Sequence, residues 1–524
     1  MSSTGPRARA ECAARERLVV SLLRETDPPV TRDGDLLRIT LPAGVLGVRA
    51  RVISPTGHHR FGPDMTLDDR AADHDAVVAA VLDAVAAPPG HAALVADSVR
   101  RTARYLAAPP RREPDPTRAA EQALRLGHPF HPTPKSAEGL GDDDLATWAP
   151  ELGASFVLHH LALDPRVVVS GGAPAPPTPA VAAHLPDGWT ALPVHPFQAR
   201  VLAGDPTLAL LEAEGSARWL GPLGDPVWPT SSVRTVVDTV TGAAWKLPLR
   251  ARLTHFVRTT PVEQARRAVD AGIVVDGLGA LPAGFGVIAD RGFATLDPAV
   301  GGERLAADLT VMTRAPFPPG GPRVLAALLE DGPGGEEPPL MADVRAAGNV
   351  HAWLRRWLAV SLLPLLRLFG AAGIGFEAHP QNTLVVTDAS GWPTACWVRD
   401  LEGAHVRRDR MPPGLADDSP LVYPPAEAWQ RLRYHAVVNH LALLVAVLGR
   451  CTVGEDALWD TVAATLAAVD DPDAAPWAAD LLTSPTLPAK AHLRSWAVGR
   501  GEDPIYLDLP NPIAAARRAV RGGS

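Results

Sequence analysis

A carboxamide and a carboxylate in the C-terminal third have the types and spacing of a magnesium–phosphate site. Asn382 ends the run Glu377-Ala-His-Pro-Gln-Asn, and Asp400 follows an apolar run and begins Asp-Leu-Glu-Gly. Hard oxygen ligands at the ends of two neighbouring segments suit Mg²⁺, which takes few protein ligands and keeps several waters. In an extended loop, Glu377, His379 and Gln381 would share one face toward substrate, and Asn382 would point to the metal.

A second cluster combines hydroxyl groups with cations. The run Pro229-Thr-Ser-Ser-Val-Arg-Thr is followed by Lys246, Arg250, Arg252, Thr254, His255 and Arg258. Hydroxyls before a cation at a loop-to-strand transition are typical of anion binding, and one strand would place Lys246, Arg250 and Thr254 on a common face. A solvated basic strand is the simpler interpretation of such a run, but the density of Ser, Thr, Lys and Arg weakens it.

Two further runs place histidines beside prolines. In Gly127-His-Pro-Phe-His-Pro-Thr-Pro-Lys the prolines prevent a helix, so His128, His131 and Lys135 would be donors on a stiff loop. A zinc site and a purely structural loop both stay open here, because H-x-x-H without a third ligand is weak support for zinc. In Pro193-Val-His-Pro-Phe-Gln a structural role for His195 is favoured, and His435 and His440 show no spacing that indicates a metal.

The surrounding pattern predicts three parts, since 524 residues are too many for one core. Residues 1–125 indicate a helical lobe with a β-hairpin at 36–53, and residues 126–338 indicate a strand-rich lobe. Residues 339–524 are helical again, except for a strand pair at 383–386 and 395–399 joined by a Gly-Trp-Pro turn.

Composition narrows the class of protein. The net charge of −8 gives no footprint for nucleic acid, and Cys12, Cys396 and Cys451 are far apart with no C-x-x-C pair. The N-terminal apolar run is too short for a signal peptide, and the apolar segments 357–376 and 436–449 contain polar residues, which indicates buried helices rather than membrane spans. A cytoplasmic enzyme with small-molecule substrates is expected, with neither nucleic acid nor membrane as a partner.

The order of the motifs is more specific than any one of them. GHPFHPTPK, PVHPFQ, PTSSVRTV, KLPLRARLTHFVRT, EAHPQN and RDLEG, over residues 127–403, resemble the IucA/IucC family of siderophore synthetases. The resemblance implies an α+β, hand-like fold of thumb (1–125), fingers (126–338) and kinase-like palm (339–524). It also implies that ATP and Mg²⁺ serve to adenylate citrate or a related di- or tricarboxylic acid, which is then joined to an amine, hydroxylamine or alcohol. Homodimers are common among such proteins.

The same resemblance assigns roles to single residues. It implies that Ser232, Arg234 and Thr235 form a phosphate-binding loop and that Lys246 contacts the nucleotide phosphates. It implies that His128, His131 and Lys135 belong to a loop over the nucleotide. It implies a grip on the substrate carboxylates by Thr254, Arg258 and His379. It implies that Glu377, Asn382 and Asp400 hold the metal and that Gln381 helps to organise the phosphates. Pro380 departs from the usual palm motif, where a second polar residue is common, and could stiffen the loop.

Two other functions stay open. A kinase-like phosphotransferase would also use Lys246, Asn382 and Asp400, although no H-R-D loop or G-x-G-x-x-G loop is present. A non-catalytic siderophore or metal binder would use the HPxHP loop. The region beyond residue 410 also resembles the helical domain of ferric-siderophore reductases, but clustered cysteines are missing, which argues against a reductase.

Overall fold

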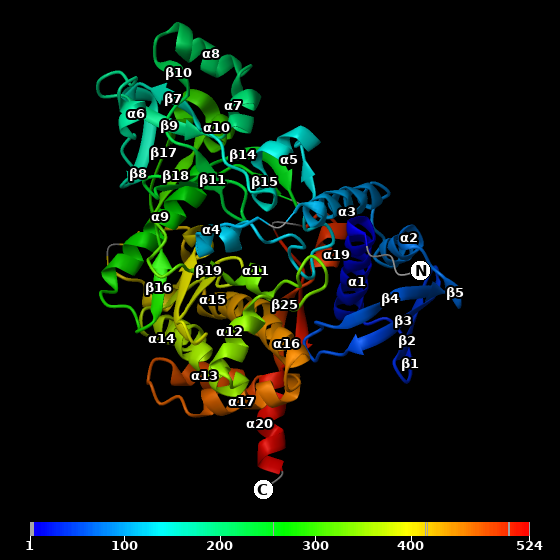
Figure 1. Ribbon diagram of the computed structural model, residues 1–524. Coiled ribbons are helices and arrows are strands. Elements are labelled where there is room, and N and C mark those ends of the chain that lie inside the picture. Colours follow the sequence, from blue (N-terminus) through cyan, green and yellow to red (C-terminus); the bar gives the residue numbers. More distant parts are fainter. Residues whose placement is uncertain are drawn as a thin grey trace.

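The computed structural model describes residues 5–109, 111–254, 256–413, 415–416, 418–500 and 503–522 (Figure 1). The fold is α+β, as predicted, with helices and mostly antiparallel sheets in all three parts. His255, named above in the basic cluster, lies outside the described residues.

The N-terminal part packs helices against a five-stranded sheet of order β1-β2-β3-β4-β5. Its elements are α1 (Pro6–Thr26), β1 (Val30–Asp33), β2 (Leu36–Leu41), β3 (Gly44–Val52), β4 (Arg60–Leu67), β5 (Arg70–Ala71), α2 (His74–Ala84), α3 (His91–Ala107) and α4 (Pro116–Glu121). The predicted hairpin is confirmed as β2 and β3, paired from Leu36–Arg49 to Leu41–Gly44. The apolar faces of α1 and this sheet share one core, which includes Leu18, Leu22 and Ile39.

The middle part contains most of the strands. They are β6 (Ala137–Glu138), β7 (His159–Leu163), β8 (Val168–Gly172), β9 (Thr190–Val194), β10 (Ala217–Pro222), β11 (Val227–Pro229), β12 (Thr235–Asp238), β13 (Ala244–Lys246), β14 (Leu249–Leu253), β15 (Phe256–Arg258), β16 (Phe285–Ile288), β17 (Asp290–Leu296), β18 (Val311–Arg314) and β19 (Arg323–Val324). The helices between them are α5 (Asp142–Trp148), α6 (Pro179–Ala182), α7 (Pro196–Leu202), α8 (Pro206–Ala213), α9 (Val262–Gly277), α10 (Pro298–Leu309) and α11 (Leu325–Leu329). The largest sheet has the order β11-β12-β13-β18-β17-β8.

The C-terminal part is mainly helical, as predicted. Its helices are α12 (Leu340–Ala347), α13 (Val350–Val360), α14 (Leu362–Ala371), α15 (Pro425–Leu432), a π-helical segment (Arg433–Leu441), α16 (Ala442–Cys451), α17 (Glu455–Ala467), α18 (Ala475–Thr483), α19 (His492–Ala497) and α20 (Pro512–Gly522). Its strands are β20 (Ile374–Gly375), β21 (Thr383–Thr387), β22 (Pro393–Arg399), β23 (His405–Arg407), β24 (Val422–Tyr423), β25 (Thr486–Lys490) and β26 (Tyr506–Pro510). The predicted strand pair is β21 and β22, joined by a turn in which Gly391 has φ +79°.

Two sets of contacts cross the lobe boundaries expected from the sequence. The sheet β16-β22-β21-β19 takes β16 and β19 from before residue 338. At the other end, α19 returns to the N-terminal part, where Leu493 and Trp496 join the core of α1, so the red and blue segments lie side by side in Figure 1. Long-range pairing of this kind leaves no local mark on a sequence.

The helix from Pro425 to Cys451 is long and apolar enough to cross a membrane by length and composition alone. However, 83% of its most apolar window is buried inside the protein. Since a core helix passes the same test, this helix is weak support for a membrane span.

The basic cluster does not form one continuous strand. Pro248 separates β13 from β14, and because proline has no N–H it interrupts the ladder. Lys246 is buried on β13, whereas Arg250 pairs with Asp308 away from the cavity that Lys246 lines. The expected common face of Lys246, Arg250 and Thr254 is therefore wrong.

Candidate active site

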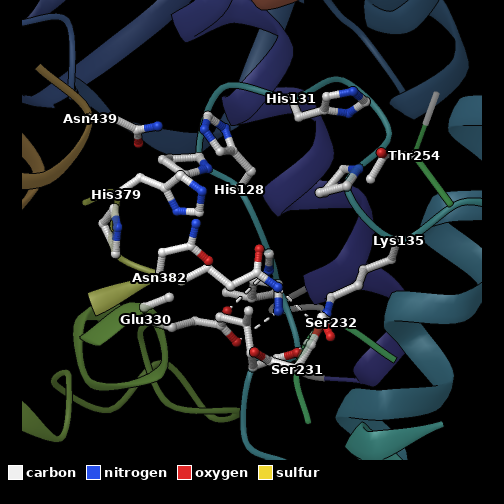
Figure 2. A pocket seen from close by; sticks show the side chains of 18 of the residues that line it. His128, His131, Lys135, Ser231, Ser232, Thr254, Glu330, His379, Asn382 and Asn439 are labelled. Atoms are coloured by element: carbon white, nitrogen blue, oxygen red, sulfur yellow. Dashed lines mark hydrogen bonds between the residues drawn. The ribbon is translucent and has the colours of Figure 1, made fainter. Parts of the chain in front are cut away.

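One cavity of about 720 Å³ lies where the three parts meet. Of the fourteen site residues expected from the sequence, thirteen line it: His128, His131, Lys135, Ser232, Arg234, Lys246, Thr254, Arg258, Glu377, His379, Gln381, Asn382 and Asp400. In Figure 2, His379, Asn382 and Asn439 lie on one side, and His131, Thr254 and Lys135 lie on the other. Thr235 is the exception, because it is buried within β12, directly opposite Lys246 in the ladder.

One end of the cavity, here called the fingers end, is lined by a network of paired charges around Lys246 and Asp400. Lys246 Nζ contacts the Asp400 carboxylate and lies 2.6 Å from Glu402 Oε2. Arg314 adds a bond of 3.2 Å to Asp400, and Arg234 lies 3.5 Å from Glu402. Burial alone would raise the pKa of Asp400, but Lys246 and Arg314 outweigh it and hold this pKa far below its usual value. Asp400 is therefore ionised at neutral pH.

The hairpin β21–β22 brings the two candidate metal ligands together. Asn382 precedes β21, Asp400 follows β22, and the Arg399 N–H donates to the Asn382 carbonyl at 3.0 Å. Asn382 Nδ2 donates to the Glu377 carbonyl at 3.3 Å, so its Oδ1 is the atom left to accept or to ligate. The sequence prediction that two neighbouring segments end side by side is confirmed.

Buried carboxylates hold the two loops that face this hairpin. Glu121 is fully buried, pairs with Arg399, and accepts from both the N–H and the hydroxyl of Ser231 at 2.9 Å. Glu330 accepts the backbone N–H groups of residues 125, 126 and 127 at 2.6–3.0 Å, just before the HPxHP loop. Each carboxylate thus fixes a loop by several charge-assisted bonds.

Three of the seven non-glycine residues with positive φ in the described part of the chain lie at the cavity. Val233, Thr254 and Asp400 all have positive φ, at +68°, +63° and +70°, and all three line the cavity. Left-handed backbone is rare for any residue with a side chain, and rarest for a β-branched one such as valine. Strain of this kind collects where the surrounding structure must aim particular groups, which marks this region as functional.

The other end of the cavity, here called the thumb end, is lined by neutral imidazoles, among them His128 and His492. Burial lowers the pKa of His128 to about 3, with a further contribution from His379, and burial together with His435 lowers that of His379 to about 4. His128 and His492 have ring centroids 4.4 Å apart. These imidazoles are therefore uncharged at neutral pH.

Glu377 is placed differently from the expectation. The chain turns at this point, because the His379 N–H bonds the Glu377 carbonyl, so the residues of the motif do not alternate in an extended loop. The Glu377 carboxylate lies 3.1 Å from Arg431 and 3.2 Å from His435. Gln381 instead donates to the Ser231 carbonyl at 3.1 Å.

Two other predicted residues have partners within the protein. Lys135 Nζ lies 2.6 Å from both Glu151 Oε1 and the Leu124 carbonyl, so it lines the cavity as one half of an ion pair. His195 accepts the Phe197 N–H at the start of α7 and packs against Trp148 and Phe156, the structural role that the sequence favoured. Thr235, as noted, does not reach the cavity.

Sequence reasoning missed several residues of the site. Glu402 lies within the RDLEG motif but was given no role there, and Arg314, at the end of β18, belongs to no motif. Five more residues that line the cavity and were not predicted come from the C-terminal part: Arg431, His435, Asn439, Lys490 and His492. Tyr434, His435 and Asn439 stand on the π-helical segment, a rare form that is frequent at functional sites, but no sequence pattern marked it. Within the described part of the chain, no group of three or more His, Cys, Asp or Glu residues is placed to hold a metal ion.

Two family models match this chain, and the curated proteins include relatives along almost its whole length. The family model described as "IucA / IucC family" matches residues 116–330, and one described as "Ferric iron reductase FhuF-like transporter" matches residues 351–503. The L-2,3-diaminopropanoate–citrate ligase of Staphylococcus aureus is 33% identical over 96% of this chain and 96% of its own. The rhizobactin siderophore biosynthesis protein RhbC of Rhizobium meliloti is 29% identical over 92% of this chain and 93% of its own.

A solved structure shares the fold. The ATP-bound aerobactin synthetase IucA from Klebsiella pneumoniae superposes with a TM-score of 0.86 at 24% identity, covering 96% of this chain and 99% of that one. Fold and site thus define a synthetase of the three-part, hand-like type. The chain belongs to the IucA/IucC family, which confirms the resemblance carried by the ordered motifs.

Proposed function

We propose that this protein uses ATP and Mg²⁺ to adenylate a carboxylate of citrate or a related acid, and then joins the acyl group to an amine, hydroxylamine or alcohol. AMP and pyrophosphate would be the nucleotide products. The relatives named above, a citrate ligase and a siderophore biosynthesis protein, support this reaction class. The ATP-bound neighbour supports the choice of nucleotide.

The observation that carries the proposal is the cation cluster at the fingers end. Lys246, Arg234 and Arg258 line the same cavity as Asn382 and Asp400; the first two are buried and Arg258 is half-buried. Preorganised cations in a water-poor site stabilise the charge that develops on a leaving pyrophosphate. The paired Asp400 and Glu402 would release these cations to the phosphates as the substrate enters.

The acid would bind beside this cluster. Arg258 Nη2 donates to Thr254 Oγ1 at 3.2 Å, so the strained turn at Thr254 and the guanidinium act together. Burial and the nearby Arg234 lower the pKa of Arg258 to about 10, which leaves it charged at neutral pH. We assign Arg258, Thr254 and the neutral His379 to the carboxylates of the acid.

The residues present fit a magnesium ion. Asp400 is ionised and Asn382 offers Oδ1, and Mg²⁺ commonly takes one or two such ligands together with substrate phosphates. When bound there, the ion would neutralise phosphate charge. Glu377 is left out of this set, because Arg431 and His435 already hold its carboxylate.

A hydroxylamine-trapping screen over citrate, succinate and α-ketoglutarate tests the proposal. With ATP and Mg²⁺, we expect a hydroxamate from citrate or a close analogue, with the Arg258→Ala variant much less active. Absence of hydroxamate from any di- or tricarboxylic acid in the screen would contradict the proposal. The chemistry needs no disulfide, and Cys12, Cys396 and Cys451 are free, which supports work in the cytoplasm. A homodimer stays a prediction for light scattering to test.

A phosphotransferase is the second candidate, favoured by the contact of Lys246 with Asp400 near Asn382. It would produce ADP rather than AMP. A pure metal or siderophore binder would show no ATP turnover, and Lys246→Ala would leave its binding unchanged.

A further inference from the structure

A chain of hydrogen bonds leads from the thumb wall of the cavity into the C-terminal helices. His58, in the loop between β3 and β4, lines the cavity, and its Nδ1 lies 2.9 Å from Thr56 Oγ1. Thr56 Oγ1 lies 3.1 Å from Ser54 Oγ, which donates to Glu455 Oε2 at 2.9 Å. Glu455 begins α17, so 401 residues separate the two ends of this last bond.

The carboxylate sets the direction of every bond in this chain. Ionised Glu455 can only accept, so the Ser54 hydroxyl donates to it and the Thr56 hydroxyl donates to Ser54. The remaining lone pair on Thr56 Oγ1 then accepts from His58 Nδ1–H. His58 Nε2 is left as an acceptor, and among the described residues this buried atom has no hydrogen-bond partner. A buried acceptor without a partner is costly and calls for a donor from a ligand.

The surroundings of His58 keep its ring neutral. The ring packs edge-on against Phe130, with centroids 4.8 Å apart. Burial, together with Arg24 from α1, His59, His128 and Arg450 from α16, holds the pKa of His58 well below its usual value. Burial and the positive charges of Arg24 and Arg450 disfavour a doubly protonated ring, so uptake of a proton at Nε2 drives the Nδ1 proton out through the two hydroxyls.

Glu455 is suited to receive that proton. Its carboxyl is buried with Ser54 at one oxygen, and burial, aided by Asp456, raises its pKa to about 7 despite the Ser54 bond. Protonation of Glu455 therefore costs little at neutral pH, unlike protonation of the ring.

We propose that His58 accepts the proton that an amine nucleophile loses, and that the side chains of Thr56, Ser54 and Glu455 carry it away. This inference rests on the proposed ligase function. The amine arrives as an ammonium ion, and one of its N–H protons moves to His58 Nε2. The free amine nitrogen then bonds to the acyl carbon, AMP leaves with the electron pair of the broken C–O bond, and the departing phosphate takes the second N–H proton. The Nδ1 proton passes to Thr56, the Thr56 proton to Ser54, and the Ser54 proton to Glu455. After Glu455 loses that proton and the two hydroxyls rotate, the ring still carries its hydrogen on Nε2. Release of this hydrogen to water in the cavity and uptake of one at Nδ1 restore the starting state.

Two kinds of nucleophile separate this role from a structural one. Hydroxylamine is largely uncharged at neutral pH and attacks without help, whereas an alkylamine arrives as an ammonium ion that must lose a proton. The experiment compares citryl hydroxamate formation with amide formation, using the alkylamine that the wild type accepts best among L-2,3-diaminopropanoate and spermidine, the amines in the names of two relatives.

Thr56→Val removes the relay hydroxyl at nearly constant volume, and Thr56→Ser keeps it. For Thr56→Val we expect amide formation at pH 7 to fall about 100-fold, the range of general base catalysis, with hydroxamate formation within about twofold of wild type. We expect Thr56→Ser to restore amide formation, and the deficit of Thr56→Val to shrink as pH rises and more free amine is present. Glu455→Gln should behave as Thr56→Val.

Several results would overturn the inference. Equal losses with both nucleophiles would mean that the bonds only join thumb and palm, and no loss would mean that the relay is idle. A wild type that makes hydroxamate but accepts neither alkylamine would also overturn it, since no ammonium proton would need an acceptor. A wild type that makes no hydroxamate would instead contradict the proposed function itself.

Discussion

At the fingers end of the cavity Lys246 contacts Asp400 and Glu402, whereas at the thumb end the His128 ring lies against that of His492 and close to His58. Burial disfavours the charged form of the groups at both ends, but the outcome differs. Opposite charges at 2.6 Å outweigh desolvation at the first end, so the groups stay ionised. Desolvation wins at the second, so the imidazoles stay neutral.

This contrast matches the two halves of the proposed reaction. Adenylation places negative charge on the departing pyrophosphate. Fixed cations stabilise this charge, and the fingers end supplies them. Condensation with an amine needs groups that accept protons, which neutral rings can do and arginines cannot.

The largest effect is expected from Lys246→Met. Loss of the buried ammonium removes phosphate stabilisation and leaves Asp400 and Glu402 with only Arg314 and Arg234 as partners, so adenylation should fall about 1,000-fold. Pyrophosphate release with citrate measures it, and a thermal melt checks that the variant is folded. A folded variant with activity within tenfold of wild type would show that the charged end is not the phosphate site.

A smaller and more selective effect is expected from Arg258→Ala. The KM for the acid should rise about 100-fold, the value of a lost charge-assisted pair, while the KM for ATP changes less than about threefold. Arg252→Ala is the matched control, because Arg252 lies on the neighbouring strand β14 with its side chain 47% exposed. Equal changes in both KM values would place Arg258 at the nucleotide instead.

The smallest effect concerns stability and the neutral histidines. The pKa values of His128 and His379 in the folded protein, about 3 and about 4, lie below the unfolded value of 6.5. Between the folded and the unfolded pKa values, the unfolded chain binds more protons than the folded protein. The free energy of unfolding should therefore rise with pH and reach its full value above about pH 6.5. Melting temperatures at pH 5, 6, 7 and 8 test this, with a shallower dependence expected for His128→Gln. A flat profile between pH 5 and 6.5 would show that these rings titrate normally.

Much of the fingers end was predictable from sequence. Apolar, strand-like runs and a Gly-Trp-Pro turn located the hairpin β21–β22, and the hairpin brings Asn382 and Asp400 together. Gly391 permits the turn because it has positive φ, and an added Cβ there would meet the Asp343 carbonyl at 2.2 Å. Local patterns suffice where the contacts are local.

The thumb end was not predictable in the same way. His492 enters the cavity because the N-terminus of α19 is bound by Glu25 of α1, whose carboxylate accepts the N–H groups of Leu493 and Arg494 across more than 400 residues. Glu455 meets Ser54 over a similar separation. The sequence analysis passed over the run Ser-Pro-Thr-Gly-His-His at 54–59 because its partner lies in another lobe.

Analysis of the nucleotide products during turnover with citrate, hydroxylamine, ATP and Mg²⁺ tests the central claim most directly. Phosphorus NMR resolves AMP, ADP, pyrophosphate and phosphate in one sample. The account predicts AMP and pyrophosphate in equal amounts, matched by hydroxamate. ADP as the sole nucleotide product would contradict it and would make the contact between Lys246 and Asp400 part of a phosphotransferase.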